Sequence, residues 1–226
     1  MKQYLFLGIA VLGLLSGCSS APQAKLQASI GTYQASSIGR SYVLVLRPQQ
    51  QPVSITVNIS GPGGYSESIT LQSASARTPS GVWWEIGWDA SRALASGTYT
   101  ISASIDGQNE QVSVDVNASS ALAQPTVTIG PNPTTRSVTA SWNAVPGASG
   151  FLVRLVNRTT NTVVASARVT SLSTTFSNLS LNTSDQYAFQ VYAAGSNIAA
   201  DPPVVPGGQF NMALGESTNF TVSPAP

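Results

Sequence analysis

The stretch Val138-Thr-Ala-Ser-Trp142, the turn Ala144-Val-Pro-Gly-Ala-Ser-Gly150 and the run Phe151-Leu-Val-Arg-Leu155 decide the fold. In the two runs every second residue is apolar. A period of two places those side chains on one face of a β-strand. The sequence therefore predicts two successive strands joined by a turn rich in Gly and Pro, which indicates antiparallel β-structure.

The residues that follow carry the marks of a known family. Leu181 lies six residues before Tyr187, and apolar residues alternate from Tyr187 to Val191. With Trp142 on the second strand and Gly150-Phe151 opening the third, residues 125–226 resemble a fibronectin type III domain. The resemblance implies a tyrosine corner, in which the Tyr187 ring fills the edge of the core and its hydroxyl bonds the backbone.

Two departures from the family accompany this resemblance. Thr183 stands where the family has a proline, two residues after the leucine. The segment between the strand at 187–193 and the last strand near 218–222 is much longer than the family's loop.

The preceding region, residues 28–117, shows about seven short apolar-alternating runs separated by turns, such as the hairpin signal Asp106-Gly107. This pattern is typical of an immunoglobulin-like β-sandwich. The low-complexity segment 118–124 separates the two regions, so the sequence predicts an all-β chain of two tandem sandwiches. The runs are Tyr42–Leu46, Val53–Ile59, Ser66–Leu71, Val82–Trp88, Thr98–Ile105 and Gln111–Val116, with a weaker one near Leu26–Ile30.

The N-terminus has the pattern of a secretory signal: Lys2, an apolar run from Tyr4 to Leu15, then Ser16-Gly17-Cys18. Leu15-Ser-Gly-Cys18 resembles the lipobox of bacterial lipoproteins. The resemblance implies that residues 1–17 are removed between Gly17 and Cys18, that Cys18 is lipidated, and that residues 18–27 form a tether. An ordinary signal peptide with a chance cysteine is the alternative, although Cys18 is the only cysteine in the chain.

Family analogy also bears on location. Ser19, rather than an aspartate, follows the cysteine, and this favours the outer over the inner membrane. A single cysteine leaves no disulfide, so both sandwiches must be stable through their cores.

Charge limits the partners. Only 8% of residues are charged, against about 25% in ordinary proteins. The chain has 10 Lys+Arg and 9 Asp+Glu, and Lys2 would leave with the signal peptide, so the mature chain is formally neutral. Lys25 is its only lysine, and no basic stripe exists to neutralise phosphates, which excludes nucleic acid as a partner.

Catalytic chemistry has few residues to use. The chain has no histidine, its one thiol is the expected lipid acceptor, and a Ser–Lys pair would need Lys25 in the tether. The one suggestive carboxylate pair is Glu85 and Asp89, in a sandwich with little room for a cleft. The sequence predicts neither an enzyme nor a cofactor, and its scattered acidic residues lack calcium-loop spacing, so we expect no metal site.

The first candidate contact site is Gly81-Val-Trp-Trp-Glu-Ile-Gly-Trp-Asp89, which holds three of the four tryptophans. Alternation predicts Trp84, Ile86 and Trp88 on the core face and Trp83, Glu85 and Asp89 on the outer face. An exposed Trp83 beside two carboxylates would suit a sugar ring or a protein partner. The alternatives are that Trp83 packs across neighbouring strands, or that a bulge at Gly87 shifts the parity.

The second candidate is the long segment from Gly195 to Gly215. Its prolines exclude a central strand, and it carries apolar residues that a disordered loop would not need: Val204, Val205, Phe210 and Met212. Two interpretations remain open. The segment is either a partner interface or it packs on its own molecule, against the sheet edge or the first sandwich.

The leading hypothesis from the sequence is a non-catalytic, membrane-anchored envelope lipoprotein that acts as a structural or protein-interaction module. Its partners would be the membrane, through Cys18, and other envelope proteins. The rival hypothesis is a module that binds peptidoglycan or surface polysaccharide through Trp83.

Overall fold

The computed structural model describes residues 24–72 and 81–225. These residues form fourteen β-strands and one 3-10 turn (η1, Pro62–Gly64), which confirms the predicted all-β class. Within the described ranges no helix is long and apolar enough to span a membrane. The strands are β1 Leu26–Gln34, β2 Ile38–Leu46, β3 Ser54–Gly61, β4 Tyr65–Gln72, β5 Trp83–Asp89, β6 Gly97–Ile105, β7 Gln108–Val116, β8 Val127–Ile129, β9 Val138–Trp142, β10 Gly150–Asn157, β11 Thr162–Val169, β12 Ser173–Phe176, β13 Tyr187–Ala194 and β14 Met212–Glu216.

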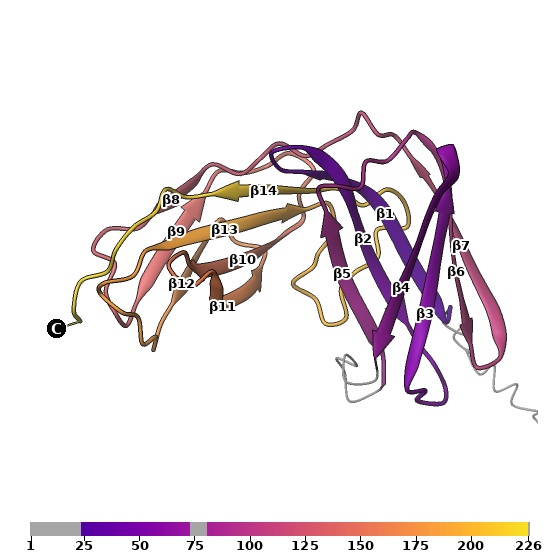
Figure 1. Cartoon of the computed structure of the whole chain (residues 1–226), viewed down its shortest axis with the longest axis horizontal. Coiled ribbons are helices and arrows are strands. Elements are labelled where there is room, and N and C mark those ends of the chain that lie inside the picture. The colour runs from indigo at the N-terminus through magenta and orange to yellow at the C-terminus, as the bar shows by residue number, and fades with distance from the viewer. Residues whose placement is uncertain (1–23, 73–80, 226) are drawn as a thin grey trace, which may run out of the picture.

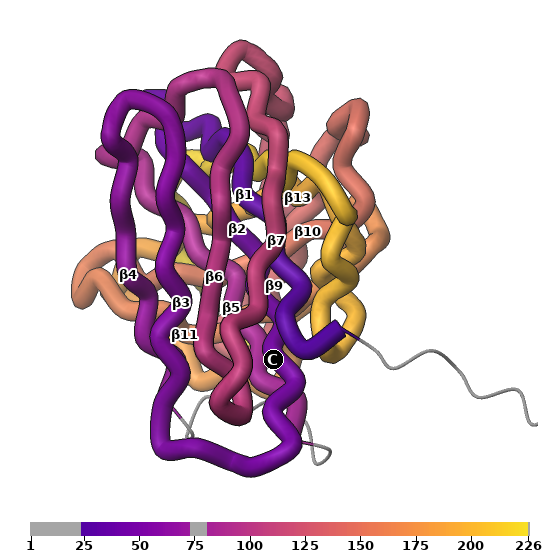
Figure 2. The backbone as a smooth tube through the Cα atoms, turned by 90° about the vertical axis from the view of Figure 1, so that its right-hand side faces the viewer, coloured from indigo at the N-terminus to yellow at the C-terminus, as the bar shows by residue number. Residues whose placement is uncertain are grey.

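The two halves of the chain are sandwiches with the same strand order. In the first, β1-β2-β5 face β4-β3-β6-β7; in the second, β8-β9-β12 face β11-β10-β13-β14. In each half the first, second and fifth strands form one sheet, and the fourth, third, sixth and seventh form the other. Figure 2 shows β4, β3, β6 and β7 side by side on the near face of the first sandwich. The order in the first sandwich, which its sequence left open, thus repeats that of the second.

Each sandwich has its own apolar core. The first core draws its buried residues from 26–116, and the second from 122–222. Alternating residues of facing sheets fill both cores, as expected for packed β-sheets. Leu122, inside the segment predicted as a linker, is buried in the second core.

A tyrosine corner stabilises each sandwich at the equivalent strand. The Tyr187 hydroxyl accepts the N–H of Asn182 at 2.8 Å and donates to its carbonyl at 3.2 Å, which confirms the predicted corner. The Tyr99 hydroxyl makes the same two bonds to Ala95, both at 3.1 Å. The sequence showed no such fingerprint in the first sandwich because the leucine, Leu94, is five residues from Tyr99 rather than six.

The two sandwiches share one sheet. β14, the last strand of the second sandwich, pairs in parallel with the end of β1, with Tyr33 opposite Met212. The result is a single seven-stranded sheet in the order β11-β10-β13-β14-β1-β2-β5, which runs through both halves of the bent molecule (Figure 1). Gly31 permits this approach, because a Cβ there would lie 2.1 Å from the Phe210 carbonyl oxygen.

We expect Tyr99→Phe and Tyr187→Phe each to lower the free energy of unfolding by about 1 kcal/mol, because each removes a hydroxyl that satisfies two backbone groups. The two tyrosines lie in separate cores, so the double variant should lose about the sum. Urea denaturation followed by circular dichroism measures both. An unchanged stability for Tyr99→Phe would contradict a corner in the first sandwich.

Candidate interaction surface

Trp83 is buried, which corrects the predicted outer face of β5. Its side chain is 0% exposed in the first core, and its indole N–H donates to Gln51 Oε1 at 2.9 Å. The strand pairs with β2 without a register shift, so the predicted alternation is right and only the choice of face is wrong. The error arises because the second sandwich covers the other face of β5, a tertiary contact that local alternation does not reveal.

Gly87 is not a bulge. It lies opposite Tyr42 in regular register, and a Cβ at this position would come 2.2 Å from the Tyr42 ring. The glycine therefore makes room for an aromatic ring on the neighbouring strand.

Glu85 and Asp89 have other hydrogen-bond partners than the Trp83 indole. Glu85 accepts the Tyr42 hydroxyl at 2.9 Å. Asp89 ends β5 and accepts the hydroxyl and N–H of Ser91, and these hydrogen bonds lower the pKa of its carboxyl. Both acids line a shallow hollow of about 270 Å³ that also includes Arg40. The structure does not bring Trp83, Glu85 and Asp89 together as one sugar-binding face.

A buried ion pair that the sequence analysis missed joins the two sheets near this hollow. Arg40 on β2 binds both carboxylate oxygens of Glu67 on β4, and each side chain is 8% exposed. The Tyr65 hydroxyl donates to the same carboxylate at 2.7 Å. Burial alone would raise the pKa of Glu67, but the hydrogen bonds from Arg40 and Tyr65 outweigh it and lower that pKa. One sequence feature could have indicated this ion pair: Glu67 alternates with Tyr65 and Ile69 and so falls at an inward-facing position of its strand.

The segment from Gly195 to Gly215 packs on its own molecule. Phe210 and Met212 are 0% exposed, in a third apolar cluster between the sandwiches that includes Tyr33 and Tyr192. Of the two interpretations left open by the sequence, packing on its own molecule therefore holds for Phe210 and Met212, because β14 must pass along β1 and its flanking apolar residues fill the junction. Val205 packs partly against the same cluster, and Val204 is 51% exposed.

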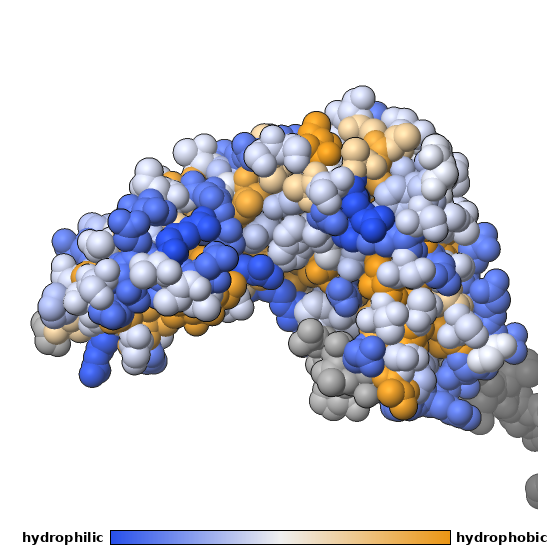
Figure 3. Space-filling model, in the orientation of Figure 1, coloured by the Kyte–Doolittle hydropathy of each residue, from blue (hydrophilic) through white to orange (hydrophobic). Residues whose placement is uncertain are grey.

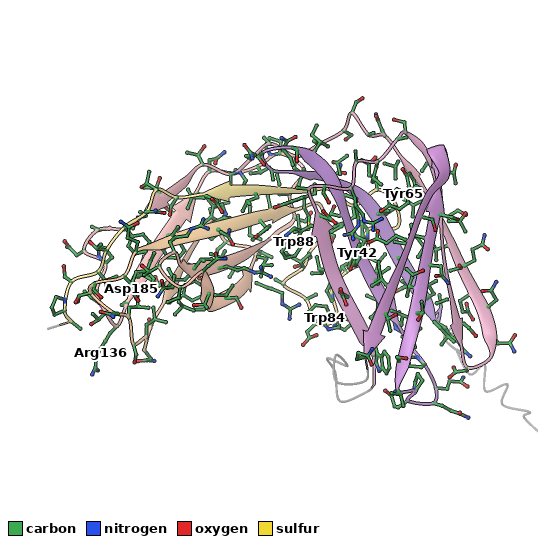
Figure 4. All side chains as sticks on the ribbon, in the orientation of Figure 1. Tyr42, Tyr65, Trp84, Trp88, Arg136 and Asp185 are labelled. Carbon is green, nitrogen blue, oxygen red and sulfur yellow. The ribbon has the colours of Figure 1, made fainter. Side chains whose placement is uncertain are left out.

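The outer face of β5 and the outer face of β10 and β11 form the walls of a groove on the inner side of the bend. The hollow has a volume of about 290 Å³. Figure 4 shows Trp84 and Trp88 there, and the space-filling view has hydrophilic and hydrophobic residues side by side at the bend (Figure 3). We call this the inter-sandwich groove; its lining residues are Trp84, Glu85, Ile86, Trp88, Leu152, Arg154, Ser166 and Arg168.

Arginines of the second sandwich stack on tryptophans of the first in this groove. The Arg168 guanidinium lies 4.5 Å from the Trp84 ring centroid, and that of Arg154 lies 4.9 Å from Trp88. Such contacts contribute about 0.5–1 kcal/mol at exposed sites and more when desolvated. They hold the two walls together and give the groove a mixed aromatic and cationic surface.

The Gly195–Gly215 segment is hydrogen-bonded to both walls of the groove. Arg168 donates to the carbonyls of Ile198 and Ala200 at 3.1 and 2.9 Å. The Trp84 indole N–H donates to Asp201 Oδ1 at 2.8 Å. Arg168 is therefore the residue that connects the loop, the second sandwich and the β5 tryptophan.

The chemistry of the inter-sandwich groove comes from its aromatic and charged side chains. Among the residues that the structure describes, no three His, Cys, Asp or Glu side chains come together as a metal site. The groove offers indole rings, guanidinium groups, the Glu85 carboxylate and the Ser166 hydroxyl. Cys18 and Gly17, the predicted lipidation and cleavage residues, lie outside the described residues.

The comparisons with known proteins concern the fold. No family model and no curated protein matches the sequence. Among solved structures, the FN1–FN3 domains of chicken CNTN1 are 15% identical over 88% of this chain and 67% of theirs, with a TM-score of 0.35. A two-domain fibronectin type III segment of chicken tenascin is 16% identical over 86% and 98%, with a TM-score of 0.33. Titin domains A168–A170 are 12% identical over 87% and 66%, with a TM-score of 0.32. The structural neighbours are thus fibronectin type III and immunoglobulin-like domains.

We expect Phe210→Ala to destabilise the protein by about 3–5 kcal/mol, because it leaves a cavity at the junction. Val204→Ala, in the same segment but exposed, should change stability by no more than about 0.5 kcal/mol. Chemical denaturation of both variants measures the difference. Equal, small effects would contradict a structural role for the segment.

Proposed function

We propose that this chain is a non-catalytic cell-envelope lipoprotein whose two sandwiches form one rigid bracket and present an interaction surface to other envelope proteins. The observation that carries the proposal is the parallel pairing of β14 with β1 across the two sandwiches. Two domains joined only by a linker would move independently by default. A shared sheet and a buried junction instead favour a structure that holds a fixed shape.

The position of the N-terminal tether fits a bracket. β14 joins β1 at its last two residues, Tyr33 and Gln34, whereas the chain enters β1 at Leu26. Eight residues of strand span about 26 Å. A lipid on Cys18 would therefore hold the first sandwich by the end remote from the junction, and the second sandwich would project away from the attachment point.

The inter-sandwich groove is the surface that we propose for protein partners. Its walls come from both sandwiches, so its shape depends on the fixed junction. Aromatic and arginine side chains that are partly exposed are residue types enriched at protein interfaces. Here Trp84, Trp88, Arg154 and Arg168 supply both types.

Polysaccharide binding remains the second candidate function. The ring that would contact the sugar is now that of Trp84 rather than that of Trp83. Trp83 lies in the core, but Trp84 is partly exposed in the groove beside two arginines. One face of the Trp84 ring is already stacked by Arg168, which favours a protein partner. A saturable change in tryptophan fluorescence with a panel of cell-wall polysaccharides, lost in Trp84→Phe, would favour the glycan instead.

The membrane anchor gives the direct test. In a bacterial host, the full chain should incorporate radiolabelled palmitate and sediment with the membranes, and Cys18→Ser should incorporate none and retain its signal peptide. Ser16→Thr, a small polar change two residues away, is the matched control. Equal labelling of Cys18→Ser would contradict lipidation at Cys18.

A further inference from the structure

We infer that the inter-sandwich groove takes an acidic side chain of the protein partner, and that the carboxylate of this side chain pairs with Arg154. The inference rests on the proposed function, since it gives the chemistry of a partner at the surface proposed there. A guanidinium binds a carboxylate through two parallel N–H···O bonds, and arginine is therefore common where carboxylates are recognised.

Arg154 differs from the other arginines that the structure describes in having no acid of its own. Arg47 donates to Gln27 Oε1, and Arg136 is exposed on the loop before β9. Arg154 lies inside a hollow and forms no ion pair with any carboxylate in residues 24–72 and 81–225. The arginines that do form ion pairs are Arg40, Arg92, Arg158 and Arg168.

Two aromatic rings hold the Arg154 guanidinium in position. It lies 4.9 Å from the Trp88 ring centroid and 5.4 Å from that of Tyr192, and it donates a hydrogen bond to the Tyr192 hydroxyl. The two rings lie 4.7 Å apart at their centroids. Stacking fixes the plane of a guanidinium and leaves further N–H groups at its edge for a carboxylate. Because the side chain is already ordered, binding would cost little of its conformational entropy.

The groups beside Arg154 also favour an anion. Ser166 lies directly opposite Arg154 on β11, and Arg168 lies one pair further along, opposite Leu152. All of them line the groove. The Ser166 hydroxyl offers another donor, and the positive charge of Arg168 adds to the attraction for a carboxylate.

The acids of this region are engaged elsewhere. Glu85 lines the groove, Asp201 lies 4.0 Å from Arg168, and Glu216 is on β14. None of the three forms an ion pair with Arg154, and each has a donor of its own. These donors are the Tyr42 hydroxyl for Glu85 at 2.9 Å, the Trp84 indole for Asp201 at 2.8 Å and Arg158 for Glu216 at 2.8 Å.

The size of the groove suits a side chain. Its volume of about 290 Å³ is at the lower limit of pockets that enclose small molecules, about 300–1,000 Å³. A carboxylate could also come from an acidic polysaccharide. A protein side chain is favoured because Arg168 already stacks on the Trp84 ring that a sugar would need.

Two peptides test the charge pairing. They are blocked decapeptides that are identical except for a central Glu or Gln, and each is titrated into the purified full chain. The Glu peptide should shift the Arg154 Nε–H resonance saturably and bind about tenfold more tightly than the Gln peptide. Equal affinities, or no shift with either peptide, would overturn the inference.

Variants of Arg154 separate charge from shape. Arg154→Gln should abolish the preference for Glu, and Arg154→Lys should retain only part of it, because an ammonium group cannot bind a carboxylate as a fork. Arg136→Gln is the matched control and should bind as the parent does. All three should keep the circular dichroism spectrum. A preference for Glu that survives in Arg154→Gln would refute the pairing. So would a galacturonate oligomer that shifts the Arg154 resonance where the Glu peptide does not, a result that would favour the polysaccharide.

Photo-crosslinking in cells distinguishes this inference from the proposed function. A benzophenone amino acid at Val164, which is partly exposed on β11 two residues before Ser166, would report proteins that occupy the groove. Cross-links to envelope proteins that persist unchanged in Arg154→Gln would overturn the acidic contact and leave the proposed surface standing. No cross-links, together with an intact preference for the Glu peptide, would contradict the proposed function alone.

Discussion

The pairing of β14 with β1 is the constraint on which the rest of the structure depends. It joins residues that are 179 positions apart in the chain and makes the seventh strand of one sandwich a neighbour of the first strand of the other. The Phe210 N–H donates to the Ile30 carbonyl at 3.1 Å, and the Asn211 side chain accepts the Thr32 N–H at 2.9 Å. These bonds precede the paired residues and extend the contact, so the second sandwich meets the first through backbone as well as side chains.

The long β13–β14 segment and the inter-sandwich groove both follow from this pairing. To reach β1, the chain must leave the second sandwich after Ala194 and return at Met212, and its apolar residues fill the space between the two halves. The same approach brings the outer face of β5 toward β10 and β11, where Arg168 stacks on Trp84. A groove made in this way cannot keep its shape if the sandwiches separate. The proposed rigidity and the proposed binding surface therefore depend on the same strand pairing.

The sequence predicted what depends on local pattern and missed what depends on distant contacts. Alternation predicted the β-class and most strands, and the spacing of Leu181 and Tyr187 predicted the second tyrosine corner. The alternation of side chains along β5 was predicted correctly, but the face assigned to the core was wrong. Trp84, Ile86 and Trp88 lie on the face that the second sandwich covers. Nothing local to Met212 indicates pairing with Tyr33, and the ion pair of Arg40 with Glu67 joins strands whose register is unknown before folding. Nothing in the sequence indicated that Arg154 and Arg168 would stack on tryptophans, since an arginine between strand residues usually faces solvent.

The most direct test of the shared sheet is the distance between the two sandwiches in solution. Spin labels at Thr56 on β3 and Ser141 on β9, both exposed, would report it by pulsed electron resonance in a Cys18→Ser background. A shared sheet predicts one narrow distance distribution that does not change with salt or temperature below unfolding. A broad distribution, such as two sandwiches on a flexible linker produce, would contradict the account.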